Sequence, residues 1–425
     1  MNPARVLFAS LIGTTIEFFD FYIYGTAAVL VFPRLFFPGS DPTTATLQSL
    51  ATFALAFLAR PAGSALFGHF GDRIGRKATL VAALLTMGVS TVAIGLLPTY
   101  ASIGVLAPAL LALCRFGQGI GLGGEWGGAV LLAMENAPPQ KRAWYGMFPQ
   151  LGAPIGFILS TGVFIVLSGT LSDAQFFAWG WRVPFLASAL LVFVGLYVRL
   201  QLSETPAFQQ AIAHNERVRV PLLHVFREHG GTLALATVAG ITTFVVFYLM
   251  TVFTLSWGTA QLGFARQQFM LLQVVGVLFF GAMVPLSAHV ADRIGRFPML
   301  IAATLAIMVF GWFFGPLFST ADSLRVVLLL SLGLACMGLT YGPLGTALAE
   351  CFPTALRYTG ASLAFNFAGI FGGSFAPYIA TWLADAYGIA AVGYYLSAAG
   401  GLTLVALLML QRREAAAMPG TWDLG

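Results

Sequence analysis

Long apolar runs recur along the whole chain and constrain its fold more than any other feature. A helix of about 20 apolar residues spans a bilayer, and twelve runs here reach that length. With 58% hydrophobic and only 9% charged residues, the chain departs far from a soluble protein, in which about a quarter of the residues are charged. The sequence therefore predicts an all-α membrane protein with twelve transmembrane helices, at residues 6–32, 46–70, 78–98, 102–133, 143–169, 179–201, 232–257, 267–290, 298–318, 324–349, 358–384 and 389–411.

One long polar connection, at residues 202–231, divides these runs into two sets of six. We expect a six-helix bundle at 1–201, a cytoplasmic linker at 202–231, and a second six-helix bundle with a short cytoplasmic tail at 232–425. Fifteen of the 21 Lys and Arg residues fall in one set of loops, four fall in the other, and two lie inside the spans. Because cytoplasmic loops carry the excess of positive charge, both termini are predicted to be cytoplasmic.

An internal repeat relates the two halves. The loop Gly68-His-Phe-Gly-Asp-Arg-Ile-Gly-Arg recurs 220 residues later, so that Asp72 matches Asp292. A second echo runs from acid to base over seven residues, from Glu135 to Arg142 and from Glu350 to Arg357. Two parallel six-helix repeats are typical of transporters whose site lies between rocking halves.

Two carboxylates stand near the middle of the first apolar run, where an ionisable group is costly and marks a functional site. Glu17 and Asp20 are three residues apart, and Tyr24 continues the same helix face. Two other spans supply cations, Arg60 and Arg115. The sequence therefore predicts a charged cluster that faces the protein interior at mid-membrane depth.

These motifs resemble those of the major facilitator superfamily. The loop signature Gly68-x-x-x-Asp-Arg-x-Gly-Arg-Lys77 carries the superfamily resemblance. The chain is similar to the metabolite:proton symporter branch in the motifs that begin at Glu17, Arg60, Arg115 and Phe352. The resemblance implies proton-driven uptake of organic acids or zwitterionic metabolites, with an acid of the first helix facing an arginine of the fourth.

The charged residues have two interpretations each. Arg115, with Gln118 on the same stripe, can fork onto a substrate carboxylate or form a permanent pair with Asp20 or Glu17. Asp20, and after it Glu17, are the candidate proton carriers, because apolar surroundings favour the protonated acid and a neighbouring arginine favours the charged one. Glu17 would alternatively form a fixed pair with Arg60.

Other polar residues complete the predicted site and a predicted gate. Glu125, nearer the cytoplasm, would pass the proton inward or help to close that side, unless Trp126 and its glycines give it a packing role. The uncharged wall of the cavity is predicted from polar mid-span residues, namely Gln150, Thr243, Tyr248, Thr251, Gln273, Tyr341 and Asn366. The cytoplasmic gate is predicted from charges at helix ends, namely Asp72, Arg73, Arg76, Glu135, Arg142, Asp292, Arg293, Arg296, Glu350 and Arg357.

The predicted function is proton-coupled import of a mono- or dicarboxylate metabolite across the bacterial inner membrane. Symport of a zwitterion such as proline or betaine, proton-driven export of a drug or metabolite, and a non-transporting sensor are the alternatives. No phosphate-binding loop or nucleophile triad is visible, so we expect neither ATP use nor catalysis. The expected partners are the substrate, H⁺ and the lipid bilayer, for a monomer without cofactor, metal or nucleic acid.

Overall fold

The computed structural model describes the backbone of residues 3–74, 76–200, 221–353 and 356–417, and the side chains of all these except 3–5, 68–80, 135, 199, 221 and 415–417. This described part is helical almost throughout and has no strand. Ten of its helices are long and apolar enough to cross a membrane, and two shorter apolar helices, Val81–Leu96 and Arg296–Trp312, complete the twelve predicted spans. The all-α membrane fold is confirmed.

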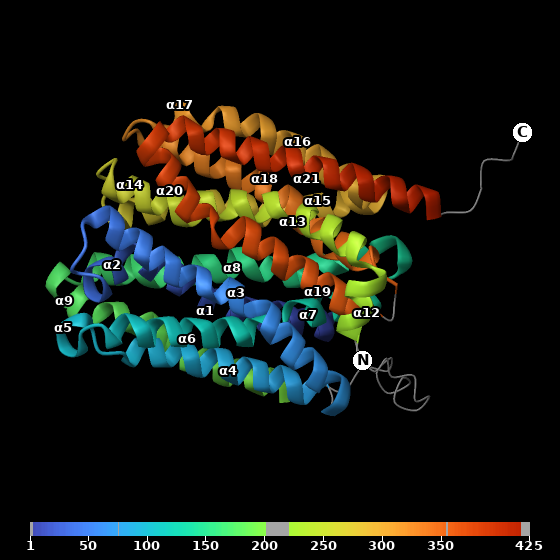
Figure 1. Ribbon diagram of the computed structural model, residues 1–425, viewed down its shortest axis with the longest axis horizontal. Helices are drawn as coiled ribbons and strands as arrows, with labels where there is room; N and C mark the ends of the chain where they lie inside the picture. Colours follow the sequence, from blue (N-terminus) through green and yellow to red (C-terminus); the bar gives the residue numbers. More distant parts are fainter. Residues whose placement is uncertain (1–2, 75, 201–220, 354–355, 418–425) are drawn as a thin grey trace, which may run out of the picture.

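The helices run side by side along the longest axis of the molecule (Figure 1). The first half consists of α1 (Pro3–Leu30), α2 (Phe32–Phe36), α3 (Pro42–Ile74), α4 (Arg76–Leu96), α5 (Tyr100–Ile103), α6 (Leu106–Gly123), α7 (Trp126–Glu135), η1 (Pro139–Lys141), α8 (Arg142–Thr170), α9 (Asp173–Ala178), η2 (Gly180–Arg182) and α10 (Val183–Leu200). The second half consists of α12 (Pro221–Glu228), α13 (Gly230–Tyr248), η3 (Leu249–Phe253), α14 (Thr254–Ala260), α15 (Arg266–Ile294), α16 (Arg296–Trp312), α17 (Phe314–Phe318), α18 (Ser323–Glu350), α19 (Arg357–Ala368), η5 (Gly369–Ser374), α20 (Ala376–Tyr387) and α21 (Ile389–Ala417). Of the predicted linker, residues 202–220 lie outside the described residues.

Several predicted continuous spans are interrupted, three of them beside the candidate site. The fourth changes from α6 to α7 at Gly124, and the seventh and eleventh each contain a π-helical stretch, η3 and η5. A π-helical turn changes the backbone hydrogen-bond pattern and is frequent at functional sites. At η3 the side-chain amide of Gln273 donates to the carbonyl oxygens of Met250 (3.2 Å) and Thr251 (2.6 Å). A polar side chain from a neighbouring helix therefore supports the irregular backbone, as the membrane interior requires.

Glycines let α3 and α6 approach closely. A Cβ atom on Gly119 would lie 2.3 Å from the carbonyl oxygen of Ala56, and one on Gly123 would lie 2.1 Å from that of Arg60. Small residues at such crossings allow two backbones to touch within a membrane. This contact brings Arg60 of α3 and Arg115 of α6 into one region of the first half.

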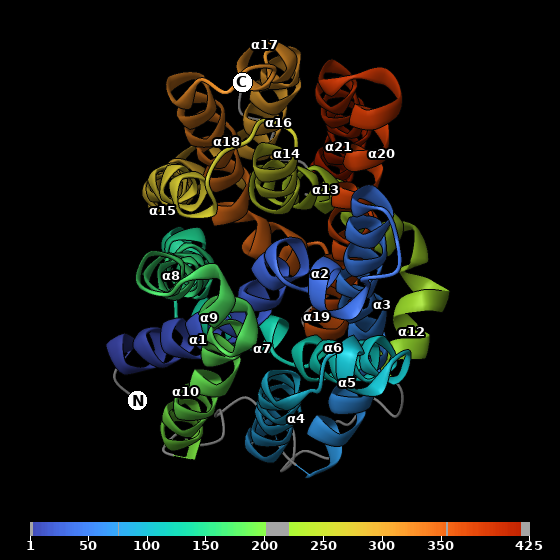
Figure 2. The same ribbon diagram turned by 90° about the vertical axis from the view of Figure 1, so that its left-hand side faces the viewer.

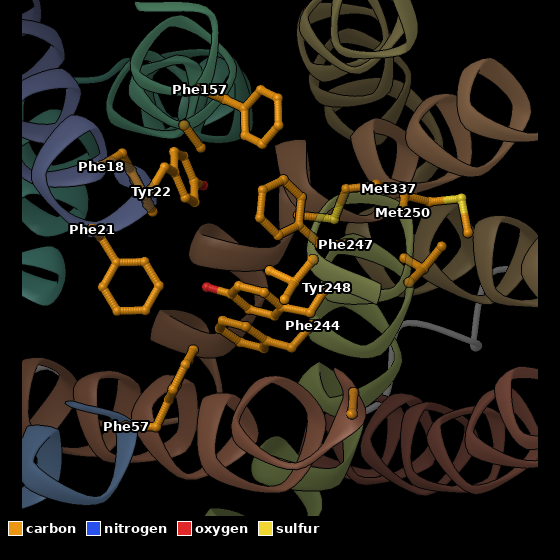
Figure 3. Close-up of a cluster of buried hydrophobic side chains, with 14 of the residues drawn as sticks. Phe18, Phe21, Tyr22, Phe57, Phe157, Phe244, Phe247, Tyr248, Met250 and Met337 are labelled. Atoms are coloured by element: carbon orange, nitrogen blue, oxygen red, sulfur yellow. The ribbon is translucent and has the colours of Figure 1, made fainter. Parts of the chain in front are cut away.

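The two halves meet along a seam, with the first half (blue to green) below the second (yellow to red) in Figure 2. Helix α8 packs against α15 and α18, and α3 packs against η5 and α19. We call the end at which α1 begins and α21 finishes the termini face, and the end that carries α2, α9 and α14 the opposite face (Figure 1). Buried aromatic side chains from both halves fill the middle of the seam (Figure 3).

Candidate substrate and proton site

Arg115 is the centre of the candidate site. Its side chain is fully buried, and its guanidinium carbon lies 4.3 Å from the ring centroid of Phe21 and 4.0 Å from that of Tyr24. Its Nη1 donates to Oε1 of Gln118 (2.9 Å), and its Nε donates to the carbonyl oxygen of Phe53 (3.4 Å). Nη2 is buried without a hydrogen-bond partner among the described residues. Arg115 is thus held by ring faces and neutral groups, and one of its donors has no partner among the described residues.

Asp20 is fully buried within the first half. The hydroxyls of Thr91 on α4 and Ser188 on α10 are the polar groups beside its carboxyl, yet neither carboxyl oxygen forms a well-directed hydrogen bond with a described residue. Among the described residues no ion pair joins Asp20 to Arg115. The expected direct facing of these two groups is therefore replaced by an indirect connection.

The connection runs through two neutral side chains. Gln118, which accepts from Arg115, donates through Nε2 to the hydroxyl oxygen of Thr91 (2.8 Å). The Thr91 hydroxyl lies beside Asp20 and is placed to donate to the carbonyl oxygen of Met87 (2.9 Å). A hydroxyl has one proton to donate, so Thr91 can serve either Asp20 or Met87 at a given time.

Glu17 and Arg60 lie nearer the second half. Both are buried, and both are within electrostatic range of Tyr22 on α1 and Tyr341 on α18. The Arg60 guanidinium carbon lies 4.6 Å from the ring centroid of Phe21 and 4.9 Å from that of Phe57. Its Nε is buried without a hydrogen-bond partner among the described residues. Arg60 therefore resembles Arg115 in resting on aromatic faces.

Tyr24 and Tyr248 frame the two arginines. The Tyr24 hydroxyl donates to Oγ1 of Thr52 (2.7 Å), which fixes the ring over Arg115. Tyr248 on α13 packs edge-on against Phe57, with ring centroids 5.3 Å apart, and its hydroxyl points toward the first half (Figure 3).

Three of the predicted wall residues tie the halves together. Gln150 accepts from the indole N–H of Trp126 (2.9 Å) and donates to the carbonyl oxygen of Tyr341 (3.0 Å). Asn366 donates to the hydroxyl of Ser64 (2.8 Å). Gln150, Tyr341 and Asn366 are therefore engaged in contacts between the halves. Two further predicted wall residues lie on or near α13: Gln273 supports η3, and Thr243 is buried on α13 itself.

Glu125 lies at the break between α6 and α7 and is buried. The neighbouring Trp126 stacks on Phe365 of the second half, with ring centroids 3.6 Å apart and nearly parallel planes. The Tyr358 hydroxyl of α19 donates to the carbonyl oxygen of Gly124 (2.9 Å). The break in the fourth span therefore lies in the packed seam between the halves, and the proton role of Glu125 stays a prediction.

Several predicted gate residues meet across the seam at the termini face. Asp292 of α15 accepts from the backbone N–H groups of Ala143 (2.9 Å) and Trp144 (3.0 Å), in the first turn of α8. Glu350 pairs with Arg142 of α8 (3.3 Å) and with Arg296 of α16. Arg357 instead donates to the carbonyl oxygen of Phe352 within its own half (3.4 Å), and Arg293 is exposed. The side chains of Asp72, Arg73, Arg76 and Glu135 lie outside the described residues.

The opposite face carries an ion pair that was not predicted from the sequence. Arg266, at the start of α15, pairs with Asp173, at the start of α9, and its guanidinium also lies 4.6 Å from the ring centroid of Phe176. A signal was present, because Arg266 is one of only four basic residues in the loops of that face. The halves are therefore joined at both ends in this conformation.

A small cavity remains in the seam. It has a volume of about 10 Å³ and is lined by residues that include Tyr22, Phe53, Tyr248, Thr251 and Gln273. A single water molecule needs about 10–15 Å³ on this measure, so a metabolite does not fit in this cavity unless the halves separate.

Comparisons with known proteins place this site in context. A family model described as "Sugar (and other) transporter" matches residues 6–224. The inner membrane metabolite transport protein YhjE of Escherichia coli (strain K12) is 57% identical over 410 residues, which cover 95% of this chain and 93% of that protein. The shikimate transporter of the same strain is 37% identical and covers 89% and 87% of the two chains. The proline/betaine transporter of Salmonella typhimurium (strain LT2) is 33% identical and covers 90% and 78%.

A solved structure agrees in fold. The crystal structure of a D-xylose-proton symporter aligns with a TM-score of 0.74 at 18% identity, over 96% of each chain. All of these proteins are transporters, in agreement with the expectation that the chain is not an enzyme.

Proposed function

The chain belongs to the major facilitator superfamily, among its metabolite transporters, and from this premise we propose that it is a proton-coupled symporter that imports a small organic anion. The anion binds Arg115, and the proton binds Asp20. Alternating access then moves both loads from the opposite face to the termini face, which is the cytoplasmic one in the predicted orientation.

The observation that carries this proposal is a pair of buried charged groups with incomplete partners. Arg115 keeps a buried Nη2 without a partner, and Asp20 keeps both carboxyl oxygens without a well-directed hydrogen bond among the described residues. Burying polar atoms in this way is costly. Such atoms persist at functional sites because a ligand satisfies them in another step of the cycle.

The relay between these groups supplies a means of coupling. When an anion draws the guanidinium of Arg115 toward itself, the bond from Nη1 to Gln118 weakens, and Gln118 loosens its hold on Thr91. The Thr91 hydroxyl is then free to change its acceptor between Asp20 and Met87. When Asp20 is charged, the Thr91 hydroxyl donates a hydrogen bond to it. When Asp20 is protonated, the Thr91 hydroxyl donates to the carbonyl oxygen of Met87 instead. Anion and proton occupancy therefore influence each other.

An anion fits the site better than a zwitterion does. A quaternary ammonium group would bind to exposed aromatic faces. The faces of Phe21, Phe53, Phe57 and Tyr24 already carry the guanidiniums of Arg60 and Arg115. A betaine would have to displace two cations with a third, whereas a carboxylate is attracted by both.

Transport by the purified protein in liposomes tests the proposal. With an inward H⁺ gradient, labelled hydroxy- and oxo-acids should accumulate, and a protonophore should abolish the accumulation. Asp20→Asn should lose uphill accumulation and retain exchange, while Asp41→Asn, at an exposed site before α3, should behave as wild type. Accumulation of proline or betaine but of no acid, efflux driven by the gradient, or uphill uptake by Asp20→Asn would each contradict the proposal.

A further inference from the structure

Two buried guanidiniums share one aromatic ring. The guanidinium carbon of Arg115 lies 4.3 Å from the ring centroid of Phe21, and that of Arg60 lies 4.6 Å from the same centroid. Arg115 is fully buried and Arg60 is 5% exposed. Like charges in a low-dielectric setting repel each other, so a ligand anion that reached both guanidiniums would lower the cost of this arrangement.

Each arginine also has an unsatisfied donor. Nη2 of Arg115 and Nε of Arg60 are buried and lack hydrogen-bond partners among the described residues. A hydrogen bond from a cation to a carboxylate is stronger than the contact of a cation with a ring face, and an arginine can make two such bonds in parallel. A carboxylate that reaches either arginine therefore replaces the ring as its preferred partner.

The positions of the two donors select the ligand. A carboxylate on Arg115 and a carboxylate on Arg60 would each lie near the ring of Phe21, because both guanidiniums contact that ring. A molecule with two carboxylates on a short carbon chain can satisfy both, with its apolar middle against the ring. Tyr248 approaches the same ring from the second half, at a centroid distance of 6.4 Å, with its hydroxyl directed toward the first half (Figure 3).

We propose that the site selects a short dicarboxylate, with one carboxylate on Arg115, the other on Arg60, the chain of the ligand along Phe21, and Tyr248 closing over it from the second half. The inference rests on the proposed function and adds the substrate class and a second anion-binding residue. Arg60 becomes the residue that distinguishes a diacid from a monoacid. Contact of the bound diacid with Tyr248 would stabilise the state in which the second half is closed over the ligand.

Matched pairs of acids test this inference in the same liposomes. Succinate, glutarate, adipate and their monomethyl esters are each tested as competitors of the uptake of a labelled acid. Each ester keeps the carbon skeleton of its diacid and lacks one charge. In the wild-type protein the best diacid should bind at least about tenfold more tightly than its ester, because loss of one charged hydrogen bond costs about 1.4 kcal/mol or more. In Arg60→Gln this ratio should fall to near one, because the variant weakens diacid binding more than ester binding.

The control variants separate a site effect from a folding effect. Arg60→Lys keeps the charge without the fork and should retain an intermediate preference. Arg34→Gln removes a guanidinium from an exposed ring contact, 4.3 Å from the centroid of Phe177, and should leave the ratio as in wild type. Size-exclusion profiles and thermal unfolding establish that each variant is folded.

The outcomes distinguish the two proposals. If the wild-type protein binds each diacid and its ester with equal affinity, the dicarboxylate inference is wrong, but organic-anion symport is not affected. This test uses the wild-type protein alone. An equal loss of diacid and ester binding in a folded Arg60→Gln protein also overturns it. If neither diacids, esters nor the hydroxy- and oxo-acids accumulate in wild-type liposomes, the proposed function itself fails.

Discussion

Asp292 caps a helix that belongs to the other half of the protein. Its carboxylate accepts from the N–H groups of Ala143 (2.9 Å) and Trp144 (3.0 Å), in the first turn of α8, and α8 has no side-chain cap from its own preceding residue. An acid at a helix N-terminus satisfies free N–H groups and interacts favourably with the helix dipole. Because the contact crosses the seam, it exists only while the termini face is closed.

The size of the effect follows from these two bonds. A hydrogen bond to a charged group contributes about 1.5–3 kcal/mol, and replacing a helix cap by alanine costs about 0.5–2 kcal/mol. Asp292 is half-buried, and water replaces it when the halves separate, so Asp292→Ala should destabilise the closed state by about 2 kcal/mol. Since 1.4 kcal/mol corresponds to a factor of ten, the open population at this face should rise about 30-fold.

A single cysteine at position 346 measures that population. Thr346 is fully buried on α18, and its hydroxyl donates to the carbonyl oxygen of Arg142 (3.4 Å), so a water-soluble maleimide reaches it only when the halves part. The three native cysteines are first replaced by serine. Asp292→Ala should raise the labelling rate about 30-fold. Asp322→Ala, which removes a carboxylate cap from α18 within one half (2.9 Å to the N–H of Leu324), should leave it unchanged. An unchanged rate in a folded Asp292→Ala protein, or an equal rise in the control, would refute the reasoning.

Three further predictions concern the other face, the packing of the first half and the relay. Arg266→Gln breaks the ion pair with Asp173, whose partial exposure limits its contribution to at most about 1 kcal/mol, and spin labels at Ser172 and Gln268 should report a longer and broader distance distribution. Gly123→Ala places a methyl group 2.1 Å from the carbonyl oxygen of Arg60 and should lower stability by about 1–3 kcal/mol, seen as a lower Tm than in Gly162→Ala, where nothing lies within 4 Å. Gln118→Glu gives Arg115 a carboxylate partner in place of an amide (2.9 Å). The variant should have a higher Tm and should bind the anion about tenfold more weakly or worse. If isothermal titration shows unchanged binding, Arg115 is not the anion ligand.

The twelve spans were predictable because they depend on local composition. Apolar runs of bilayer length are visible without any knowledge of neighbours. The interruptions were not, because they depend on groups distant in sequence. The π-helical stretch η3 is supported by Gln273 of α15, and the break at Gly124 meets the Tyr358 hydroxyl of α19. Neither partner can be identified from the sequence around the interruption.

The burial of the site residues was predictable, but their pairing was not. A charge inside an apolar run must face the protein interior, and Asp20 and Arg115 are both fully buried. Which neighbour each one meets depends on the rotation of every helix about its axis. Asp20 points to α4 and α10, and Arg115 points to Gln118 and the rings of Phe21 and Tyr24. Their opposite charges alone suggested that Asp20 and Arg115 would pair directly. In the structure, the Arg115 guanidinium lies against aromatic rings instead.

The two faces of the seam are closed by contacts of unequal strength, and this inequality bears on the direction of transport. At the termini face, Asp292 accepts from two backbone N–H groups of α8, Glu350 pairs with Arg142 across the seam, and Trp126 stacks on Phe365. At the opposite face, the described ion pair across the seam joins Arg266 to Asp173, whose side chain is 76% exposed, and exposed pairs contribute about 1 kcal/mol or less. Separation of the halves therefore costs less at the opposite face, which is the external one in the predicted orientation. Under the proposed function, an empty protein that opens more readily outward would meet its substrate outside, and the energy of binding anion and proton between the halves would then be available to break the contacts at the termini face.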